Sequence, residues 1–213
     1  MLTVHHLGIS QSERVVWLCE ELGLDYELVL YDRDPETRLA PPAYKSLHPA
    51  GTAPVIDDGD LRLAESAAVC DYIAHVHGGG RLTKGPGDIA YADYLYWFHF
   101  ANGSMMPNGM IELALTMAQA NCNGATLQGL LSRGTRAFEQ VDARLAKARW
   151  FAGDDFTIAD IMMAFPLTTM RAFVPRDIAG YPAIQAYLKR LGERPAFRAA
   201  REKGDPSFPA VLS

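Results

Sequence analysis

The sequence predicts an α/β first part followed by an all-helical second part, and three observations support this fold class. Residues 2–63 hold four short β-rich stretches with helical periodicity between them. A stretch dense in Gly and Pro, "HGGGRLTKGPGD", follows at residues 77–88 and is typical of a linker. From residue 89 onward the apolar residues follow a helical spacing. We therefore expect a small mixed sheet covered by helices, a linker, and a helical bundle.

The first part is expected to alternate strands with helices. Strands are predicted over residues 2–6, 26–31, 54–56 and 61–63. Helices are predicted over residues 12–22, 43–47 and 66–76. Gly23 is placed to end the first of these helices, and Ser66 is placed to cap the last.

The second part is expected to contain helices only. They are predicted over residues 89–120, 125–150, 157–170, 182–191 and 195–203, with the first interrupted at Gly103 and Pro107. Thr157 and Asp160 form a capping-box pattern with Asp in the place of Glu. The predicted boundaries are 1–78 for the first domain, 79–88 for the linker and 89–213 for the second domain.

Composition excludes several classes of protein. The chain has 213 residues, 49% of them hydrophobic, so it can bury a sizeable core. Its net charge is −5. It has no long basic stripe and no apolar run near the ~20 residues of a membrane span, so neither nucleic acid nor a membrane is expected as a partner. The first residues lack a charged region followed by an apolar one, and we expect no secretory signal and a cytoplasmic location.

The cysteines do not suggest a metal site or disulfides. Cys19, Cys70 and Cys122 are an odd number, form no C-x-x-C motif and lie in apolar segments. We expect small buried side chains at these positions, a reducing environment and no bound metal.

Two serines flank a glutamine where the first strand is expected to meet the first helix, in "GISQSERVVWLCEELG" at residues 8–23. A hydroxyl at such a corner can donate to an anion that also lies near a helix N-terminus. The ordinary alternative for Ser10 and Ser12 is helix capping, for which Ser is well suited.

Five stretches in order carry a resemblance to a known family: "HHLGISQSERVVWLCEELGLDYELVLYDR", "HPAGTAPVI", "LAESAAVCDYI", "YWFHFANGSMMP" and "FTIADIMM". From end to end the chain resembles a cytosolic glutathione transferase, and the first and fourth stretches look most like the bacterial and fungal branch with yeast-type members. The resemblance implies a thioredoxin-like first domain, an all-helical second domain, a homodimer active in detoxification, and glutathione as cosubstrate.

The resemblance also implies a position for the catalytic serine. In serine-type members of that family, this serine lies four residues before an arginine at the start of the helix. Ser10 and Arg14 have this spacing and Ser12 does not, so Ser10 is the predicted thiolate donor, with Ser12 as the alternative. Arg14 is expected to be a structural pairing residue.

The resemblance also assigns a glutathione cradle. Pro54 is expected to follow a cis peptide bond, with the backbone of Ala53 against the cysteinyl part of glutathione. Thr52 also belongs to this segment, although many relatives have Lys there. Arg38 or Lys45 could take over the grip on the glycyl carboxylate.

The resemblance assigns further residues to the γ-glutamyl end of glutathione and to the second substrate, the electrophile. Glu65 and Ser66 are expected to bind the γ-glutamyl end, Glu65 through the ammonium and Ser66 through the carboxylate. Asn102 is expected either to reach the partner subunit's glutathione or to mark a helix kink. Phe100 and Ser104, in an aromatic- and Met-rich stretch, are the predicted contacts of a small apolar electrophile.

Three functions fit these residues. The first is conjugation of glutathione to an apolar electrophile, with Ser10 stabilising the thiolate. The second is glutathione-dependent peroxide or disulfide reduction, in which glutathione brings the sulfur, because no Cys occupies the corner. The third is a binding protein that kept the fold without the chemistry, which the intact Ser10, Pro54 and Glu65–Ser66 set disfavours.

Overall fold

The computed structural model describes residues 1–213, and its contacts divide the chain into two compact units. Unit 1 holds Met1–Thr83 and Gly192–Ala210, and unit 2 holds Lys84–Leu191 and Val211–Ser213. The sequence pattern groups residues 192–210 with the helical part, whereas their contacts place them in unit 1.

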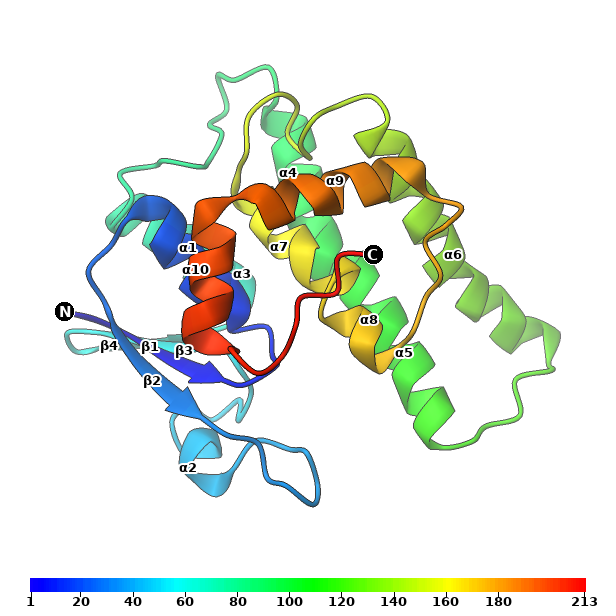
Figure 1. Ribbon diagram of the computed structural model, residues 1–213, viewed down its shortest axis with the longest axis horizontal. Helices are drawn as coiled ribbons and strands as arrows, with labels where there is room; N and C mark the ends of the chain where they lie inside the picture. Colours follow the sequence, from blue (N-terminus) through cyan, green and yellow to red (C-terminus); the bar gives the residue numbers. More distant parts are fainter. The chain divides into compact units, whose positions relative to one another are not determined.

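A four-stranded mixed sheet forms the centre of unit 1 (Figure 1). Its strands are β1 (Leu2–Leu7), β2 (Glu27–Tyr31), β3 (Val55–Asp58) and β4 (Leu61–Ala64), in the order β2, β1, β3, β4. β1 pairs parallel with β2 and antiparallel with β3, and β3 pairs antiparallel with β4. The predicted strands are confirmed, and so is the α/β class of the first part.

Four helices accompany this sheet: α1 (Glu13–Leu22), α2 (Pro42–Lys45), α3 (Ser66–Val76) and α10 (Pro195–Gly204). α1 is buried along much of its length, with Val15, Val16 and Leu18 fully buried. Gly23 ends α1 in the left-handed conformation, at φ 62°, as its sequence position predicts.

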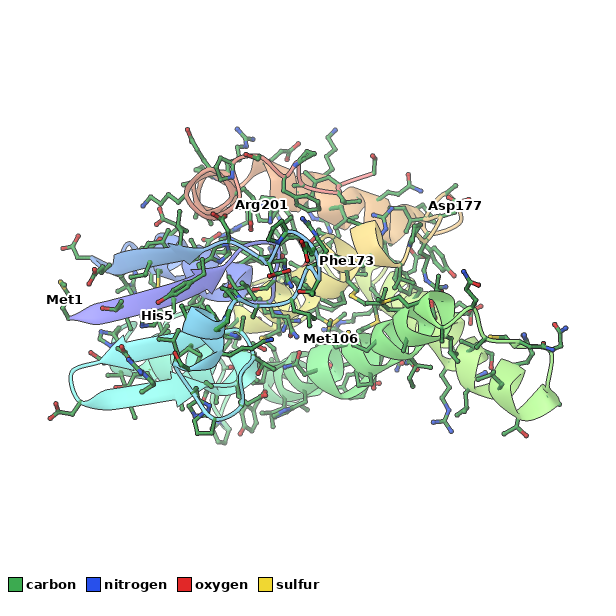
Figure 2. The ribbon with its side chains drawn as sticks, turned by 90° about the horizontal axis from the view of Figure 1, so that it is seen from below. Met1, His5, Met106, Phe173, Asp177 and Arg201 are labelled. Carbon is green, nitrogen blue, oxygen red and sulfur yellow. The ribbon has the colours of Figure 1, made fainter.

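α10 packs against α1, although the two helices come from opposite ends of the chain (Figure 1). The rings of Phe197 and Trp17 meet edge to face with centroids 5.0 Å apart. Arg201, labelled in Figure 2, pairs with Glu13 at 2.7 Å where both side chains are 12% exposed. Apolar and charged contacts together hold α10 in unit 1.

Unit 2 is helical, which confirms the predicted class of the second part. Its elements are α4 (Tyr91–Phe100), the π-helical turn η1 (Ala101–Met105), α5 (Met106–Met117), α6 (Ala125–Leu145), α7 (Ile158–Leu167), α8 (Met170–Phe173) and most of α9 (Pro182–Glu193). Every residue of α7 is buried, so this helix forms the centre of the unit. None of the helices combines the length and the apolar character that a membrane span requires.

The predicted capping box opens α7. Oγ1 of Thr157 accepts from the Ala159 N–H at 3.3 Å, and Oδ2 of Asp160 accepts from the Thr157 N–H at 2.9 Å. Of the two predicted interruptions of the first long segment, the one at Gly103 is confirmed, because Gly103 lies within η1. Such π-helical turns inside helices occur often at functional sites. The interruption predicted at Pro107 is wrong, because Pro107 lies in the first turn of α5, where a proline is tolerated.

Candidate functional site

Residues 8–12 turn the chain between β1 and α1 and carry two serine hydroxyls, and we call this turn the serine corner. Ser10 is 6% exposed, and Ser12 is fully buried. Their Oγ atoms lie 2.8 Å apart, and the backbone N–H of Ser12 donates to Oγ of Ser10 at 3.2 Å. The hydroxyls therefore form one hydrogen-bonded pair in which Ser10 is the outer member.

Ser12 occupies the N-cap position of α1, but its side chain makes no capping hydrogen bond. Its Oγ accepts from the N–H of Leu7 at 3.1 Å and lies 2.9 Å from Nδ1 of His6. The interpretation of Ser12 as an ordinary capping serine is wrong. Its backbone is already helical, at φ −68° and ψ −15°, rather than in the extended conformation typical of capping residues.

The corner is strained and is held on both sides. Ile9 has a φ of 53°, in the left-handed region that β-branched residues rarely adopt. Its N–H donates to Oδ1 of Asp205 at 2.7 Å. The guanidinium of Arg33 donates to the carbonyls of Gly8 at 2.8 Å and of Ile9 at 2.9 Å. A backbone conformation of this kind persists only where neighbouring groups hold it in place. Here the hydrogen bonds from Arg33 and to Asp205 do so.

Asp205 also faces His6. Its Oδ2 lies 3.2 Å from Nε2 of His6, and the two side chains are 4% and 1% exposed. The two side chains are in direct contact, and they form an ion pair when His6 carries a second proton. Burial alone would raise the pKa of Asp205, but hydrogen bonding and charge from His6, the N–H of Ile9 and the charge of Arg201 hold that pKa below its usual range.

Arg14 joins the serine corner to the start of α3. It is 1% exposed, and its Nη1 donates to Oγ of Ser66 at 2.9 Å and to the side-chain oxygen of Gln11. Burial lowers the pKa of Arg14 to about 10, against the opposing effect of neighbouring negative groups. Arg14 therefore stays charged at neutral pH and fixes the hydroxyl of Ser66.

The expected cradle residues lie in two short segments of unit 1. The Ala53–Pro54 peptide bond is cis, as the sequence predicts, and Thr52 before it is exposed. Glu65 is exposed with a φ of 76°, directly before Ser66, which is 3% exposed at the first position of α3. The backbone N–H of Ser66 therefore belongs to a helix N-terminus, where anions bind well. The prediction that Ser66 caps this helix is wrong, because Glu65 holds the N-cap position and no side chain caps the helix.

Comparison with protein families decides what this arrangement belongs to. Residues 10–76 match the family described as glutathione S-transferase, N-terminal domain, and residues 110–195 match glutathione S-transferase, C-terminal domain. The chain belongs to the glutathione S-transferase family. Membership makes it a transferase with the two-part fold described above.

Individual relatives agree with this assignment. Glutathione S-transferase 3 of Schizosaccharomyces pombe is 32% identical over 227 aligned positions, covering 100% of this chain and 92% of that protein. Glutathione S-transferase 1 of Saccharomyces cerevisiae is 31% identical over 228 positions, covering 95% of each. The crystal structure of a glutathione S-transferase from Actinobacillus pleuropneumoniae, 34% identical, matches with a TM-score of 0.88 over 100% of this chain and 99% of that one.

The remaining predicted residues of this glutathione S-transferase lie in unit 2. Phe100 is 8% exposed, and its ring packs on Tyr96 and Trp97 with centroid distances of 5.4 Å and 5.1 Å. Asn102 and Ser104 are half-buried in η1. Phe100 therefore belongs to an aromatic cluster, and the π-helical turn carries the two polar candidates.

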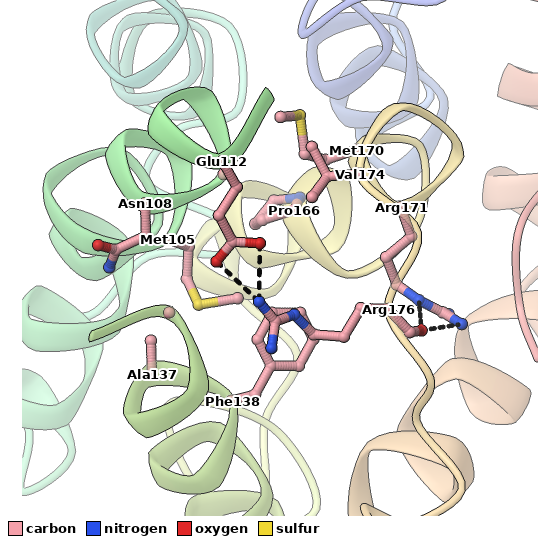
Figure 3. Close-up of a pocket in the computed structure, with 12 residues that line it drawn as sticks. Met105, Asn108, Glu112, Ala137, Phe138, Pro166, Met170, Arg171, Val174 and Arg176 are labelled. Atoms are coloured by element: carbon pink, nitrogen blue, oxygen red, sulfur yellow. Dashed lines mark hydrogen bonds and ion pairs between the residues drawn. The ribbon is translucent and has the colours of Figure 1, made fainter. Parts of the chain in front are cut away.

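Unit 2 of the transferase also contains a small cavity beside an ion pair (Figure 3). Nη2 of Arg176 lies 2.8 Å and 2.9 Å from the two carboxylate oxygens of Glu112, and the guanidinium lies 4.7 Å from the ring centroid of Phe138. The cavity measures about 20 Å³. This volume suits a single water molecule rather than a substrate.

Three residues that shape the serine corner are absent from the sequence prediction: His6, Arg33 and Asp205. The strand pattern explains His6 as an ordinary β residue. Nothing in the pattern marks Asp205, since it reaches the corner only because α10 packs on α1. The pair of histidines at the end of the first strand is the one available signal.

Proposed function

We propose that this transferase binds glutathione in unit 1, and that Ser10 donates its hydroxyl hydrogen to the glutathione sulfur and keeps it ionised. The observation that carries this proposal is the serine pair, in which Ser10 is the outer hydroxyl and Ser12 is fully buried. The thiolate then attacks a small apolar electrophile, which makes the protein a serine-type member of the family.

The energetic requirement matches what the corner offers. A free thiol has a pKa of about 8.5, so little thiolate is present at neutral pH. Lowering that pKa by about two units needs ~2.7 kcal/mol of preferential stabilisation of the thiolate. A hydrogen bond to a charged group contributes ~1.5–3 kcal/mol, and a helix N-terminus adds ~0.3–1 kcal/mol. One hydroxyl in front of α1 therefore suffices.

The cradle residues complete the proposed site. The backbone of Ala53 pairs with the cysteinyl part of glutathione, and Glu65 accepts from the γ-glutamyl ammonium. Ser66 binds the γ-glutamyl carboxylate, which its position at the start of α3 and its bond from Arg14 support. Since Arg14 is buried and charged, it adds a positive field beneath that carboxylate.

Lys45 is the residue that we propose to bind the glycyl carboxylate of glutathione. It would do so in place of the Lys that many relatives have at the position of Thr52. It is exposed on α2, and its Cγ lies 4.0 Å from where a Cβ on Gly51 would be, one residue before Thr52. We expect Lys45→Ala to weaken glutathione binding about fivefold to tenfold, as one screened charge–charge contact would. Calorimetric titration with Arg38→Ala as the matched control tests this, and equal losses in both variants would contradict it.

The second substrate and the assembly follow the family proposal. Apolar side chains that are exposed on α4 and α5 support an apolar electrophile: Tyr96, Met110, Ile111 and Met117. We assign Phe100 and Ser104 to this substrate and Asn102 to the glutathione of the partner subunit in a cytoplasmic homodimer. Sedimentation of wild type and Asn102→Ala, with glutathione titration of each, tests the assembly and the contact.

The alternative of thiol–disulfide exchange through the protein's own sulfur has little support. Cys19 and Cys70 are fully buried, and burial raises the pKa of both thiols, that of Cys70 to about 12. Neither is a nucleophile at neutral pH. The expectation that Cys122 is buried is wrong: it is half-buried in the connection between α5 and α6 of unit 2, and it is not part of the serine corner in unit 1. Peroxidase activity through glutathione itself uses the same Ser10 and differs only in the second substrate.

The deciding experiment titrates glutathione against the protein while thiolate absorbance is followed across pH. We expect wild type to bind glutathione as thiolate well below pH 8, Ser10→Ala to lose this, and Ser10→Thr to keep most of it. Turnover of chlorodinitrobenzene and of cumene hydroperoxide then separates conjugation from peroxidase activity. Bound glutathione that stays protonated in wild type would refute the proposal.

A further inference from the structure

A continuous line of polar groups leads from Ser10 into the interior of unit 1. Oγ of Ser10 lies 2.8 Å from Oγ of Ser12, which lies 2.9 Å from Nδ1 of His6. Nε2 of His6 lies 3.2 Å from Oδ2 of Asp205. The outer hydroxyl is thus connected to a buried imidazole–carboxylate pair through one buried hydroxyl.

The hydrogen-bond capacity of Ser12 permits two arrangements along this line. A serine hydroxyl has one hydrogen and two acceptor sites, and the N–H of Leu7 fills one acceptor site. When His6 is neutral with its hydrogen on Nε2, Ser12 donates to Nδ1 and accepts from Ser10. When His6 is protonated on both nitrogens, Nδ1 donates to Ser12, which then donates to Ser10 or to the Leu7 carbonyl, 3.2 Å away.

We propose that His6, supported by Asp205, accepts the thiol proton of glutathione through Ser12 and Ser10. The S–H bond breaks and its proton joins Oγ of Ser10, the Ser10 hydrogen moves to Oγ of Ser12, and the Ser12 hydrogen moves to Nδ1 of His6. The sulfur keeps its electron pair, so the products are a thiolate and an imidazolium. The new hydrogen on Ser10 faces the sulfur, and Ser12 no longer accepts from Ser10.

The surroundings of His6 favour the charged product. Asp205, directly after α10, faces His6, and Arg201 and Glu13 lie behind Asp205. Asp32, Arg33 and Arg38, from the segment after β2, line the same cavity as His6. Arg201 pairs with Glu13 at 2.7 Å and lies farther from Oδ2 of Asp205, at 3.5 Å. Oδ2 of Asp205 is therefore left mainly to His6, and an ionised carboxylate stabilises an imidazolium beside it.

The inner end of the line also has an outlet. His6 and Asp205 line a cavity of about 380 Å³ in unit 1, together with Gly8, Tyr31, Arg33 and Phe208. A proton held on His6 can pass to water there after the thiolate has reacted. Gly204 leaves room for the imidazole, because a Cβ at that position would lie 3.1 Å from Nε2.

This inference rests on the proposed role of Ser10, and the experiment separates the two. The ring signals of His6 are followed by NMR across pH in the free protein, with glutathione, and with S-methylglutathione, which binds without a thiol proton. Thiolate absorbance is recorded on the same samples. We expect glutathione to protonate His6 as thiolate forms and S-methylglutathione to leave its titration unchanged.

The outcomes divide cleanly. No thiolate in wild type means that the proposed function fails. Thiolate without a response of His6, or equal responses to both ligands, overturns the relay while Ser10 keeps its role. These measurements use the unmodified protein, so they decide the question even if a variant at His6 does not fold.

Variants sharpen the test. His6→Asn offers Ser12 an amide oxygen as acceptor in place of Nδ1, but an amide cannot take up the proton, and we expect a drop in kcat/KM of up to about a hundredfold near neutral pH. Its affinity for S-methylglutathione should match wild type. In a Ser10→Ala background the same substitution should have little further effect, because the line is already broken. Additive losses would mean a structural role for His6 and would overturn the relay.

Discussion

The backbone of Gly8 and Ile9 is held by Arg33 on one side and by Asp205 on the other, and we call these contacts the clamp on the serine corner. Arg33→Ala removes one half of this clamp, and the resulting loss of stability can be estimated from the hydrogen bonds. The guanidinium donates to the carbonyls of Gly8 and Ile9 at 2.8 Å and 2.9 Å, and burial lowers its pKa. Each bond from a charged donor is worth ~1.5–3 kcal/mol. A third bond, to the carbonyl of Arg38 at 2.9 Å, is exposed to water and adds little. Since Arg33 is half-buried, the three bonds together should contribute about 2–4 kcal/mol to the free energy of unfolding.

Urea unfolding followed by circular dichroism measures this loss directly. For a chain of this size, about 2–4 kcal/mol corresponds to a fall in Tm of roughly 5–15 °C. The thiolate titration of bound glutathione should also shift toward the pKa of the free thiol, because Ser10 follows Ile9 directly. Arg33→Lys should recover only part of both, since an ammonium lacks the fixed planar set of donors with which a guanidinium reaches both carbonyls.

Arg38→Ala is the matched control for Arg33→Ala. Arg38 is exposed and contributes its backbone carbonyl, not its side chain, to the contact with Arg33. We expect its free energy of unfolding to stay within ~0.5 kcal/mol of wild type. Arg33→Ala with a loss no greater than that control, and with an unchanged thiolate titration, would refute the clamp.

Two further predictions concern stability. In α6, a Cβ added in Gly134→Ala would overlap the carboxylate of Glu112, which would have to shift away from its two bonds to Arg176. Thermal unfolding should therefore show a loss of ~1–3 kcal/mol, whereas Gly129→Ala, with open space around it, should be neutral or stabilising, and equal effects would contradict this. Hydrogen bonds from Arg62 lower the pKa of Asp57 to about 2, and its side chain is 27% exposed, so Asp57→Asn should cost about 1–2 kcal/mol at neutral pH. A depressed pKa gives stability that is lost on acidification, so this difference should fade in urea unfolding between pH ~4 and pH ~2, and a constant difference would contradict the assignment.

Local chemistry explains which elements the sequence predicted. The helix ending at Gly23 and the capping box at Thr157 and Asp160 depend on residues within a few positions of one another, and both are confirmed. The single segment expected over residues 125–150 instead ends as a helix at Leu145. Helix ends are the least certain feature of a periodic pattern because the last turns lack intrahelical partners.

The serine corner shows where local reasoning stops. The sequence pattern alone assigns residues 195–203 to a helix, and that helix is confirmed. It does not predict that this helix docks on α1, because the contact between Phe197 and Trp17 joins positions far apart in the chain. The contacts of Ile9 and His6 with Asp205 depend on that docking, so the periodicity of the sequence could not predict them.

Asp205 separates a structural role from a chemical one, because each of its oxygens has a different partner. Oδ1 accepts from the N–H of Ile9, and Oδ2 faces His6. A buried ion pair adds little net stability after both charges have lost their water, so the contact with His6 is a weak reason for the fold. Asn at this position keeps an acceptor for Ile9 and removes the negative charge beside His6. Asp205→Asn should therefore hold the corner in place and leave the imidazolium without its counter-charge, so a loss of thiolate without a loss of stability would assign the carboxylate to the chemistry.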